Sequence, residues 1–333
     1  MAEFGILVKS YANDFEYVRR LMVSIECHNV DGVAIYIVVP DSDLALFDEF
    51  SSTHVTVLPE EMFGAHLTDL PAAGFAPGYI NQEIVKLCFW ESGYVDNYLC
   101  LDSDAEFIRD FHIHDFMFDS ETPYTFLSED SELLVEPEYY ANSWQYRATK
   151  LEEIKQAIGV TDPRLLTVHG HAVFSAKVLR SFKENFLDPR GWDYLDAVSL
   201  SPYEPTWYSM WLQHDRTIPI HAREPIIKTF HNATQHLEYV LRGVTMDDVA
   251  RGYVAVVVNS NFSRGDGVLS LNDSPHMALA SYVTTRDLIK AMRFRTYQYV
   301  VVERGPLKKA RILAGKAALR IPGLRGLVDV GSN

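Results

Sequence analysis

The sequence predicts an α/β protein built on a mixed sheet flanked by helices. Three apolar, β-branched segments at 4–8, 33–39 and 55–58 alternate with segments of helical periodicity at 14–28 and 44–50. Strands separated by helices are typical of a parallel sheet, whose ligands lie at the carboxyl ends of the strands. With 333 residues, 47% of them hydrophobic and 23% charged, the chain can form one large domain with elaborations or two closely packed ones.

The remainder of the chain continues this alternation less regularly. Residues 60–77 are rich in glycine, proline and alanine and predict a loop, which a helix follows at 79–94. An apolar strand then ends at Leu101. Further helices are predicted near 151–158, from 177 and at 207–211, and an extended segment at 219–230.

Composition restricts the partners and the compartment. A formal net charge of −15 argues against nucleic acid, because phosphate backbones need basic surface. The three cysteines, Cys27, Cys88 and Cys100, are an odd number without CxxC spacing and favour a reducing compartment. The sequence shows no signal peptide and no apolar run of membrane-spanning length. We therefore expect a cytoplasmic protein.

Polar residues follow three of the predicted strands, at Lys9, at Asp41 and at Asp102 to Asp104. Side chains alternate along a strand, so Asp102 and Asp104 are expected on the same side. Two carboxylates at a strand end suit Mn²⁺ or Mg²⁺ carrying a diphosphate. The alternative is that this Asp-Ser-Asp triplet is only a polar turn that closes the strand.

Five segments resemble those of bacterial glycosyltransferases with the GT-A fold, in particular a branch associated with cell-surface polysaccharides. They are Val8–Phe15, Leu21–Ile25, Val38–Asp41, Asn81–Leu87 and Leu101–Asp104. The resemblance covers the first 110 residues and thins to scattered motifs as far as His231. It implies a GT-A-like, Rossmann-type fold and a metal-dependent transferase. Such an enzyme moves a sugar from a nucleotide diphosphate donor, here a UDP-sugar, to a glycan or lipid-linked acceptor.

The resemblance also implies which residues bind the donor. Base and ribose are expected at the loop after the first strand, at Lys9, Ser10, Tyr11 and Asp14. Asp14 fits a helix N-cap equally well. Lys86 matches a helix lysine that reaches a phosphate or the donor sugar, with Gln82 one turn away on the same face; a solvated helix lysine is the alternative. Asp102 and Ser103 complete the expected donor contacts, and Lys228 could reach the diphosphate.

The metal shell implied by the resemblance consists of Asp102, Asp104 and a late histidine, His231. His236 competes for that place. His169, His171 and His221 also remain open as ligands. A divalent ion there would act as a Lewis acid on the departing diphosphate.

Glu204, before a predicted helix, is the candidate catalytic base that would deprotonate the acceptor hydroxyl if the reaction inverts the anomeric centre. The alternative is a glutamate that interacts favourably with the helix N-terminus. A retaining enzyme would need no such base, and the sequence leaves the stereochemistry open. Gly170 matches a loop beneath the donor sugar, where flanking histidines depart from the small residues usual in the family. Aromatic residues at Tyr139, Tyr140, Trp144 and Tyr146 could stack on acceptor sugars.

We expect a transferase core at 1–240, with a nucleotide-binding part at 1–110 and an acceptor-side part at 111–240, and a C-terminal extension at 241–333. Residues 304–325 carry seven basic side chains and no acid. On a helix they form a partly amphipathic, basic segment that could lie on an anionic inner membrane. A docked or dimerising helix is the alternative.

Two other functions remain open. A phosphatase of the Asp-x-Asp type also places such a motif at a strand end, but at an early position in the chain. A GT-A-shaped binding or scaffold protein that has lost turnover is the second alternative; Lys86, Asp102 and Asp104 argue against it.

Overall fold

The computed structural model describes residues 2–126, 145–161, 171–230 and 244–258. Its strands are β1 (Ala2–Lys9), β2 (Ala34–Val39), β3 (Val55–Pro59), β4 (Val95–Leu101), β5 (Ala105–Phe107), β6 (Tyr124–Phe126), β7 (Val173–Ser175), β8 (His221–Arg223), β9 (Ile227–Phe230) and β10 (Ala255–Val258). Its α-helices are α1 (Phe15–His28), α2 (Leu44–Phe47), α3 (Pro77–Cys88), α4 (Ile113–Phe116), α7 (Gln145–Ile158), α8 (Ala176–Phe182), α9 (Tyr194–Leu200), α10 (Glu204–Asp215) and α12 (Met246–Ala250). This arrangement confirms the predicted α/β class with a mixed sheet flanked by helices.

The central sheet has the strand order β3-β2-β1-β4-β7. β1 pairs in parallel with β2 on one side and with β4 on the other, whereas β7 is antiparallel to β4. The chain therefore moves outward from β1 to β3 and then crosses to the other side of β1 for β4. The point between β1 and β4 where the strand order reverses is the place where open α/β sheets bind ligands.

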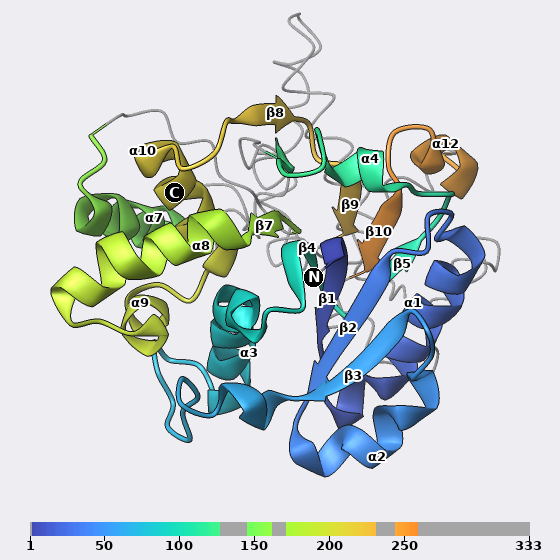
Figure 1. Ribbon diagram of the computed structural model, residues 1–333, viewed down its shortest axis with the longest axis horizontal. Coiled ribbons are helices and arrows are strands. Elements are labelled where there is room, and N and C mark those ends of the chain that lie inside the picture. The colour runs from blue at the N-terminus through green and yellow to red at the C-terminus, as the bar shows by residue number, and fades with distance from the viewer. Residues whose placement is uncertain (1, 127–144, 162–170, 231–243, 259–333) are drawn as a thin grey trace, which may run out of the picture.

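Helices cover both faces of this sheet, with α1 and α3 on opposite sides in Figure 1. α1 buries a stripe made of Phe15, Val18, Leu21 and Ile25, the spacing expected for an amphipathic helix. α3 is buried along almost its whole second half, from Ile80 to Cys88. A polar side chain on that part of α3 must find its partner inside the protein.

The close packing of β1 on β2 depends on a glycine. A Cβ atom added at Gly5 would lie 2.9 Å from Cε2 of Tyr36 and 3.1 Å from the carbonyl oxygen of Ala34. Gly5 thus leaves the space that the Tyr36 ring fills.

A second sheet, β5-β10-β9, begins directly after the Asp102–Asp104 triplet. β10 lies between β5, to which it is antiparallel, and β9, to which it is parallel. Residues beyond 240 are expected to form an extension. The described part of that region, 244–258, supplies β10, the middle strand of this sheet, whose edge strands are β5 and β9. A third, two-stranded sheet pairs β6 with β8.

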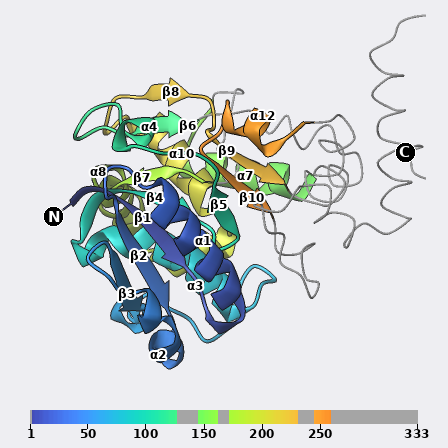
Figure 2. The ribbon, with the colours of Figure 1, turned by 90° about the vertical axis from the view of Figure 1, so that its right-hand side faces the viewer.

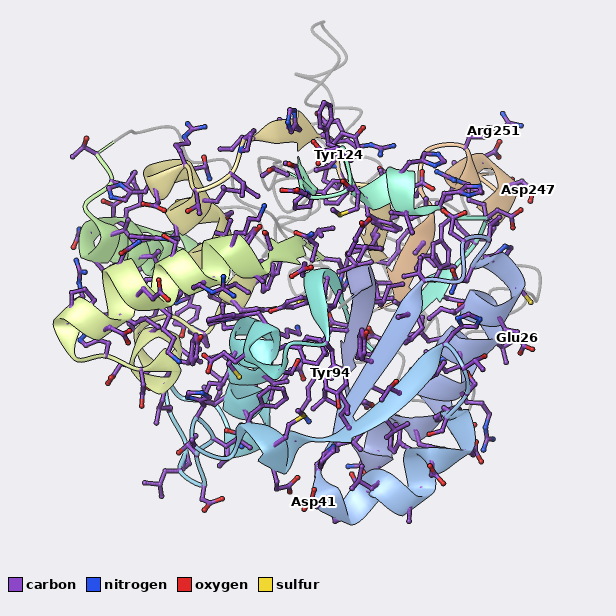
Figure 3. The ribbon with its side chains drawn as sticks, viewed as in Figure 1. Glu26, Asp41, Tyr94, Tyr124, Asp247 and Arg251 are labelled. Atoms are coloured by element: carbon purple, nitrogen blue, oxygen red, sulfur yellow. The ribbon has the colours of Figure 1, made fainter. Side chains whose placement is uncertain are left out.

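Figure 2 shows β1 running from the labelled N-terminus on the left towards the right of the view. In Figure 3, side chains fill the space between sheet and helices, while the labelled Glu26, Asp247 and Arg251 point outward from α1 and α12. Within the described ranges, no helix is long and apolar enough to cross a membrane. The basic segment 304–325 lies outside those ranges.

Candidate functional site

The ends of β1 and β4 leave the central sheet side by side. Val8 pairs with Leu101, so Lys9 and Asp102 are the next residues of two adjacent strands. The hydroxyl of Ser103 donates a hydrogen bond to Oδ2 of Asp14, 3.2 Å away, which ties together the two loops that follow these strands. Asp14 does occupy the N-cap position of α1, but its side chain makes no capping hydrogen bond. The structure therefore brings Asp14 and Ser103 together.

The first loop contains a buried hydroxyl that has no protein partner. The amide of Ser10 donates to the carbonyl oxygen of Val38 at 2.9 Å. Its side-chain oxygen is buried and makes no hydrogen bond within the described part of the chain. Lys9 turns away to an ion pair with Glu60 (Nζ to Oε2, 2.6 Å), and Tyr11 is 41% exposed. A buried hydroxyl without a partner is costly, and a ligand group at this loop would satisfy it.

Lys86 of α3 joins two carboxylates from distant parts of the chain. Its Nζ lies 3.1 Å from Oδ1 of Asp102 and 2.9 Å from Oε1 of Glu204, the first residue of α10. The side chains of Lys86 and Glu204 are only 8% and 7% exposed, whereas that of Asp102 is 40% exposed. Asp102 is thus the member of this ion-pair cluster that a ligand can reach.

The charges in this cluster depend on one another. Burial alone would lower the pKa of Lys86, but the carboxylates of Asp102 and Glu83 raise it above its usual value. Burial likewise opposes ionisation of Asp102, yet the Lys86 ammonium holds the pKa of Asp102 below its ordinary value. Both groups are therefore ions at neutral pH.

Glu83, one turn before Lys86 on α3, is a titratable residue that the sequence analysis missed. Burial raises its pKa to about 7; the attraction of Lys86 counteracts this shift and the charge of Asp102 adds to it. The only signal in the sequence is an acid three residues before Lys86 on a predicted helix, directly after Asn81 and Gln82.

His171 lies in the segment that the resemblance places beneath the donor sugar, and its contacts are what the sequence does not predict. The antiparallel pairing of Leu99 with Val173 brings His171 beside the end of β4. There its Nδ1 lies 3.1 Å from the carbonyl oxygen of Cys100. Burial lowers the pKa of His171, the Asp102 carboxylate partly opposes this, and the Lys86 ammonium adds to it. In the sequence this histidine is an open metal ligand and one of the two histidines that flank the predicted sugar-loop residue Gly170.

The Asp102–Asp104 triplet is both a turn and part of the site. β4 ends at Leu101 and β5 begins at Ala105, whose amide donates to the carbonyl oxygen of Asp102 at 3.1 Å. Strand alternation therefore does not apply here, and that argument for placing both carboxylates on one side was wrong. Asp102 and Asp104 are both partly exposed, at the junction of the two sheets.

No group of three histidine, cysteine or carboxylate side chains converges as a metal site within the described ranges. Of the predicted ligands, Asp102 and Asp104 are described. His231 and its competitor His236 lie outside the described residues, as do His169 and the predicted sugar-loop residue Gly170.

The remaining predicted residues are placed as follows. Gln82 is half-buried on α3. Lys228 is buried in β9. It pairs across the second sheet with Val256 of β10, which in turn pairs with Glu106 of β5. The Nζ atom of Lys228 lies 5.5 Å from the centre of the Phe230 ring. Burial raises the pKa of Glu106 to about 7, against the attraction of Arg20.

Of the predicted aromatic group, Tyr146 is 38% exposed and packs edge-on against Tyr203. The other three lie outside the described residues.

The chain belongs to a family of unknown function, DUF6492, whose model matches residues 6–241. That match begins within β1 and extends past β9, so it includes all the predicted site residues. No curated protein matches the sequence. Among solved structures, a crystal structure of an active-site mutant of LgtC is similar with a TM-score of 0.47 and 13% identity, over 86% of this chain and 99% of that chain. The α/β architecture is described by the strand order of the central sheet, and no argument about the site depends on this likeness.

Proposed function

We propose that this protein is a GT-A-type glycosyltransferase that transfers a sugar from a nucleotide diphosphate donor, a UDP-sugar, to a glycan or lipid-linked acceptor in cell-surface polysaccharide synthesis. The observation that carries the proposal is the grouping of polar residues at the switch point. Ser10 and Asp14 follow β1, and Asp102 and Ser103 follow β4; Ser103 binds Asp14 across the point, and Lys86 of α3 binds Asp102. Open α/β sheets bind nucleotides at such a point.

The residues at the triplet fit a hard divalent cation such as Mn²⁺ or Mg²⁺. Asp102 and Asp104 offer carboxylate oxygens at the mouth of the site, and Asp102 is accessible. Mg²⁺ in particular is held by one or two carboxylates together with substrate phosphates and water, so two protein ligands are enough. When bound, the ion would neutralise charge on the departing diphosphate.

His231 remains the proposed third ligand, with one supporting observation. It directly follows Phe230, which pairs with Val258, and the amide of Val258 donates to the carbonyl oxygen of Asp104 at 3.3 Å. β9 therefore ends in the same row of the second sheet as Asp104, roughly two strand spacings or about 10 Å away.

The chain's own residues would act as follows. The hydroxyl of Ser10 would donate a hydrogen bond to the nucleotide, and the Asp14–Ser103 pair would hold both loops in place around it. Lys86, kept cationic and fixed by its two carboxylates, would present its remaining N–H group to the donor. The role of Glu204 as a base stays a prediction; one of its oxygens is held by Lys86.

A thermal-shift panel of nucleotide sugars with and without Mn²⁺ tests the proposed function. A bound donor at about 100 times its Kd should stabilise the protein by about 2.7 kcal/mol, which is roughly 4 °C in Tm for a chain of this length. Asp104→Asn should abolish the Mn²⁺-dependent part of this shift. The control Asp69→Asn changes an exposed aspartate outside the triplet and should leave the shift unchanged. If no nucleotide sugar gives a Mn²⁺-dependent shift, the proposed function is wrong.

Ser10→Ala separates ligand binding from folding. The variant removes a buried hydroxyl that has no partner among the described residues, so the ligand-free protein should lose no stability. The affinity for UDP should fall about 2- to 10-fold, the worth of one neutral hydrogen bond. An unchanged UDP affinity would remove Ser10 from the donor site.

Membrane association through residues 304–325 is a separate proposal. It rests on the seven basic residues in that segment. Co-sedimentation with anionic liposomes should detect the full chain and not a chain that ends at Glu303; equal binding of the two would disprove this role.

A further inference from the structure

His171 has one ring nitrogen fixed and the other unused. Its Nδ1 lies 3.1 Å from the carbonyl oxygen of Cys100, and since a carbonyl can only accept, Nδ1 carries the proton. In the neutral ring, Nε2 then has a free lone pair. Nε2 makes no hydrogen bond to any described residue, although the ring is only partly exposed. The backbone of β4 thus fixes the tautomer and orients an unused acceptor.

The surroundings of His171 keep the ring neutral yet able to take up a proton. Burial, the largest effect, lowers its pKa from the ordinary value of 6.5, and the Lys86 ammonium of α3 acts in the same direction. Asp102, at the end of β4, acts in the opposite direction and would stabilise an imidazolium once formed. These are the charged groups that act on the ring from the elements beside it.

Two other roles fit less well. As a metal ligand, His171 would have to converge with Asp102 and Asp104, and among the described residues no such group of three forms. As a purely structural residue it would need only the Nδ1 bond to Cys100, which leaves unexplained an Nε2 that has no partner among the described residues. Glu204, the base predicted from the sequence, is buried and already ion-paired with Lys86.

We propose that His171 is the base of sugar transfer and that its Nε2 accepts the proton of the attacking hydroxyl. This inference rests on the proposed function and deepens it. The hydroxyl oxygen forms a bond to the anomeric carbon of the donor as the bond from that carbon to the diphosphate oxygen breaks. The electron pair of the broken bond leaves with the nucleoside diphosphate, and the hydroxyl proton moves to Nε2. The transfer is then a single displacement that inverts the anomeric centre.

Two substitutions at this position separate the base from the structural role. In His171→Asn, the amide nitrogen can replace Nδ1 and keep the bond to Cys100, but nothing replaces Nε2. In His171→Gln, an amide group reaches the position of Nε2 but cannot take up a proton. A structural role predicts that the Asn variant stays active. A base predicts that both variants lose activity while remaining folded.

The assay is release of UDP from UDP-glucose, UDP-galactose and UDP-N-acetylglucosamine by the full chain with Mn²⁺, where water serves as the acceptor. Both variants should lower kcat about 10²- to 10⁴-fold, the usual worth of a general base, with little change in KM. The wild-type rate should rise with pH through an acid limb below 6.5, and that limb should vanish in both variants. His54→Asn, at an exposed histidine, should match the wild type.

Nitrogen-15 NMR of histidine-labelled protein gives a reading that does not depend on turnover. It should show His171 protonated at Nδ1, and the Nε2 signal should shift when a UDP-sugar is added. An Asn variant within threefold of the wild-type rate, a proton on Nε2, or an unchanged Nε2 signal with a bound UDP-sugar would each overturn the proposal. Failure of every UDP-sugar to bind the wild type would instead overturn the proposed function.

Discussion

Replacing Lys86 by methionine should destabilise this protein far more than the loss of an ordinary ion pair. Methionine matches lysine in length but has no charge, so Glu204 would remain buried without a partner. Its side chain is 7% exposed and now lies 2.9 Å from the ammonium. Removing one member of a buried pair costs about 3–5 kcal/mol. Asp102 adds little, because its side chain is 40% exposed.

Urea unfolding followed by circular dichroism measures this loss, and a drop of about 4 kcal/mol corresponds to roughly 6 °C in Tm for a chain of this size. The control is Lys177→Met. Lys177 makes an ion pair of 2.8 Å with Glu121, but the two side chains are 54% and 73% exposed. That pair should be worth between 0 and about 1 kcal/mol.

The double variant Lys86→Met with Glu204→Gln should recover much of the loss, because it removes the uncompensated charge as well. Acid should also narrow the gap in stability between Lys86→Met and wild type, by the small share that Asp102 contributes. The pKa of Asp102 is lowered in the folded protein, so its stabilisation is present above the ordinary value of 3.8 and disappears as pH falls through the lowered value. An origin of the loss in the buried ion pair is refuted if Lys86→Met lowers the free energy of unfolding no more than Lys177→Met does. It is also refuted if the double variant is no more stable than Lys86→Met alone.

Three further outcomes are expected. Glu83→Gln should raise the free energy of unfolding by about 3 kcal/mol at pH 8 and leave it unchanged at pH 4, because a pKa of about 7 against an ordinary 4.5 destabilises the fold progressively as pH rises through that window. Urea titrations at both pH values test this, and an equal gain at both would contradict it. Ser103→Ala should lower the free energy of unfolding by about 1 kcal/mol, because it removes the hydrogen bond to Asp14. If the losses from Ser103→Ala and Asp14→Ala simply add in the double variant, measured by the same urea titration, the two side chains do not stabilise each other. Gly5→Ala should cost about 1–3 kcal/mol by pushing on the Tyr36 ring, and a Tm equal to wild type would show that the ring moves freely.

The first half of the fold could be predicted because its signals are local. The strand expected at 33–39 is observed at Ala34–Val39, where a β-branched run lies between Gly32 and Pro40. The helix expected at 79–94 ends at Cys88 and continues only as a 3₁₀ turn to Ser92. Gly93, with φ +71°, then redirects the chain, and a helical pattern in the sequence does not show where such a turn begins.

The second sheet could not be predicted, because its order is decided by contacts between distant segments. β5 has three residues and pairs with β10, some 150 residues later, so neither strand carries enough pattern to reveal its partner. The same reason explains the site. The resemblance places Lys86 and Asp102 at one donor site, but the approach of Glu204 depends on the packing of α10 on α3. His171 depends likewise on the register of β7.

The charges around Lys86 connect the proposed chemistry with the acidity of the chain. Three carboxylates, those of Glu83, Asp102 and Glu204, act on or bind one ammonium, and Asp104 follows two residues after Asp102. A diphosphate entering this region would meet a surplus of negative charge. Either a divalent cation at the triplet or a proton on Glu83 would reduce that repulsion, and the pKa of Glu83, about 7, allows the second at neutral pH. A divalent ion held by Asp102 and Asp104 would also act as a Lewis acid on the departing diphosphate, which a proton on Glu83 would not do. Binding alone could therefore use either, whereas transfer should need the metal.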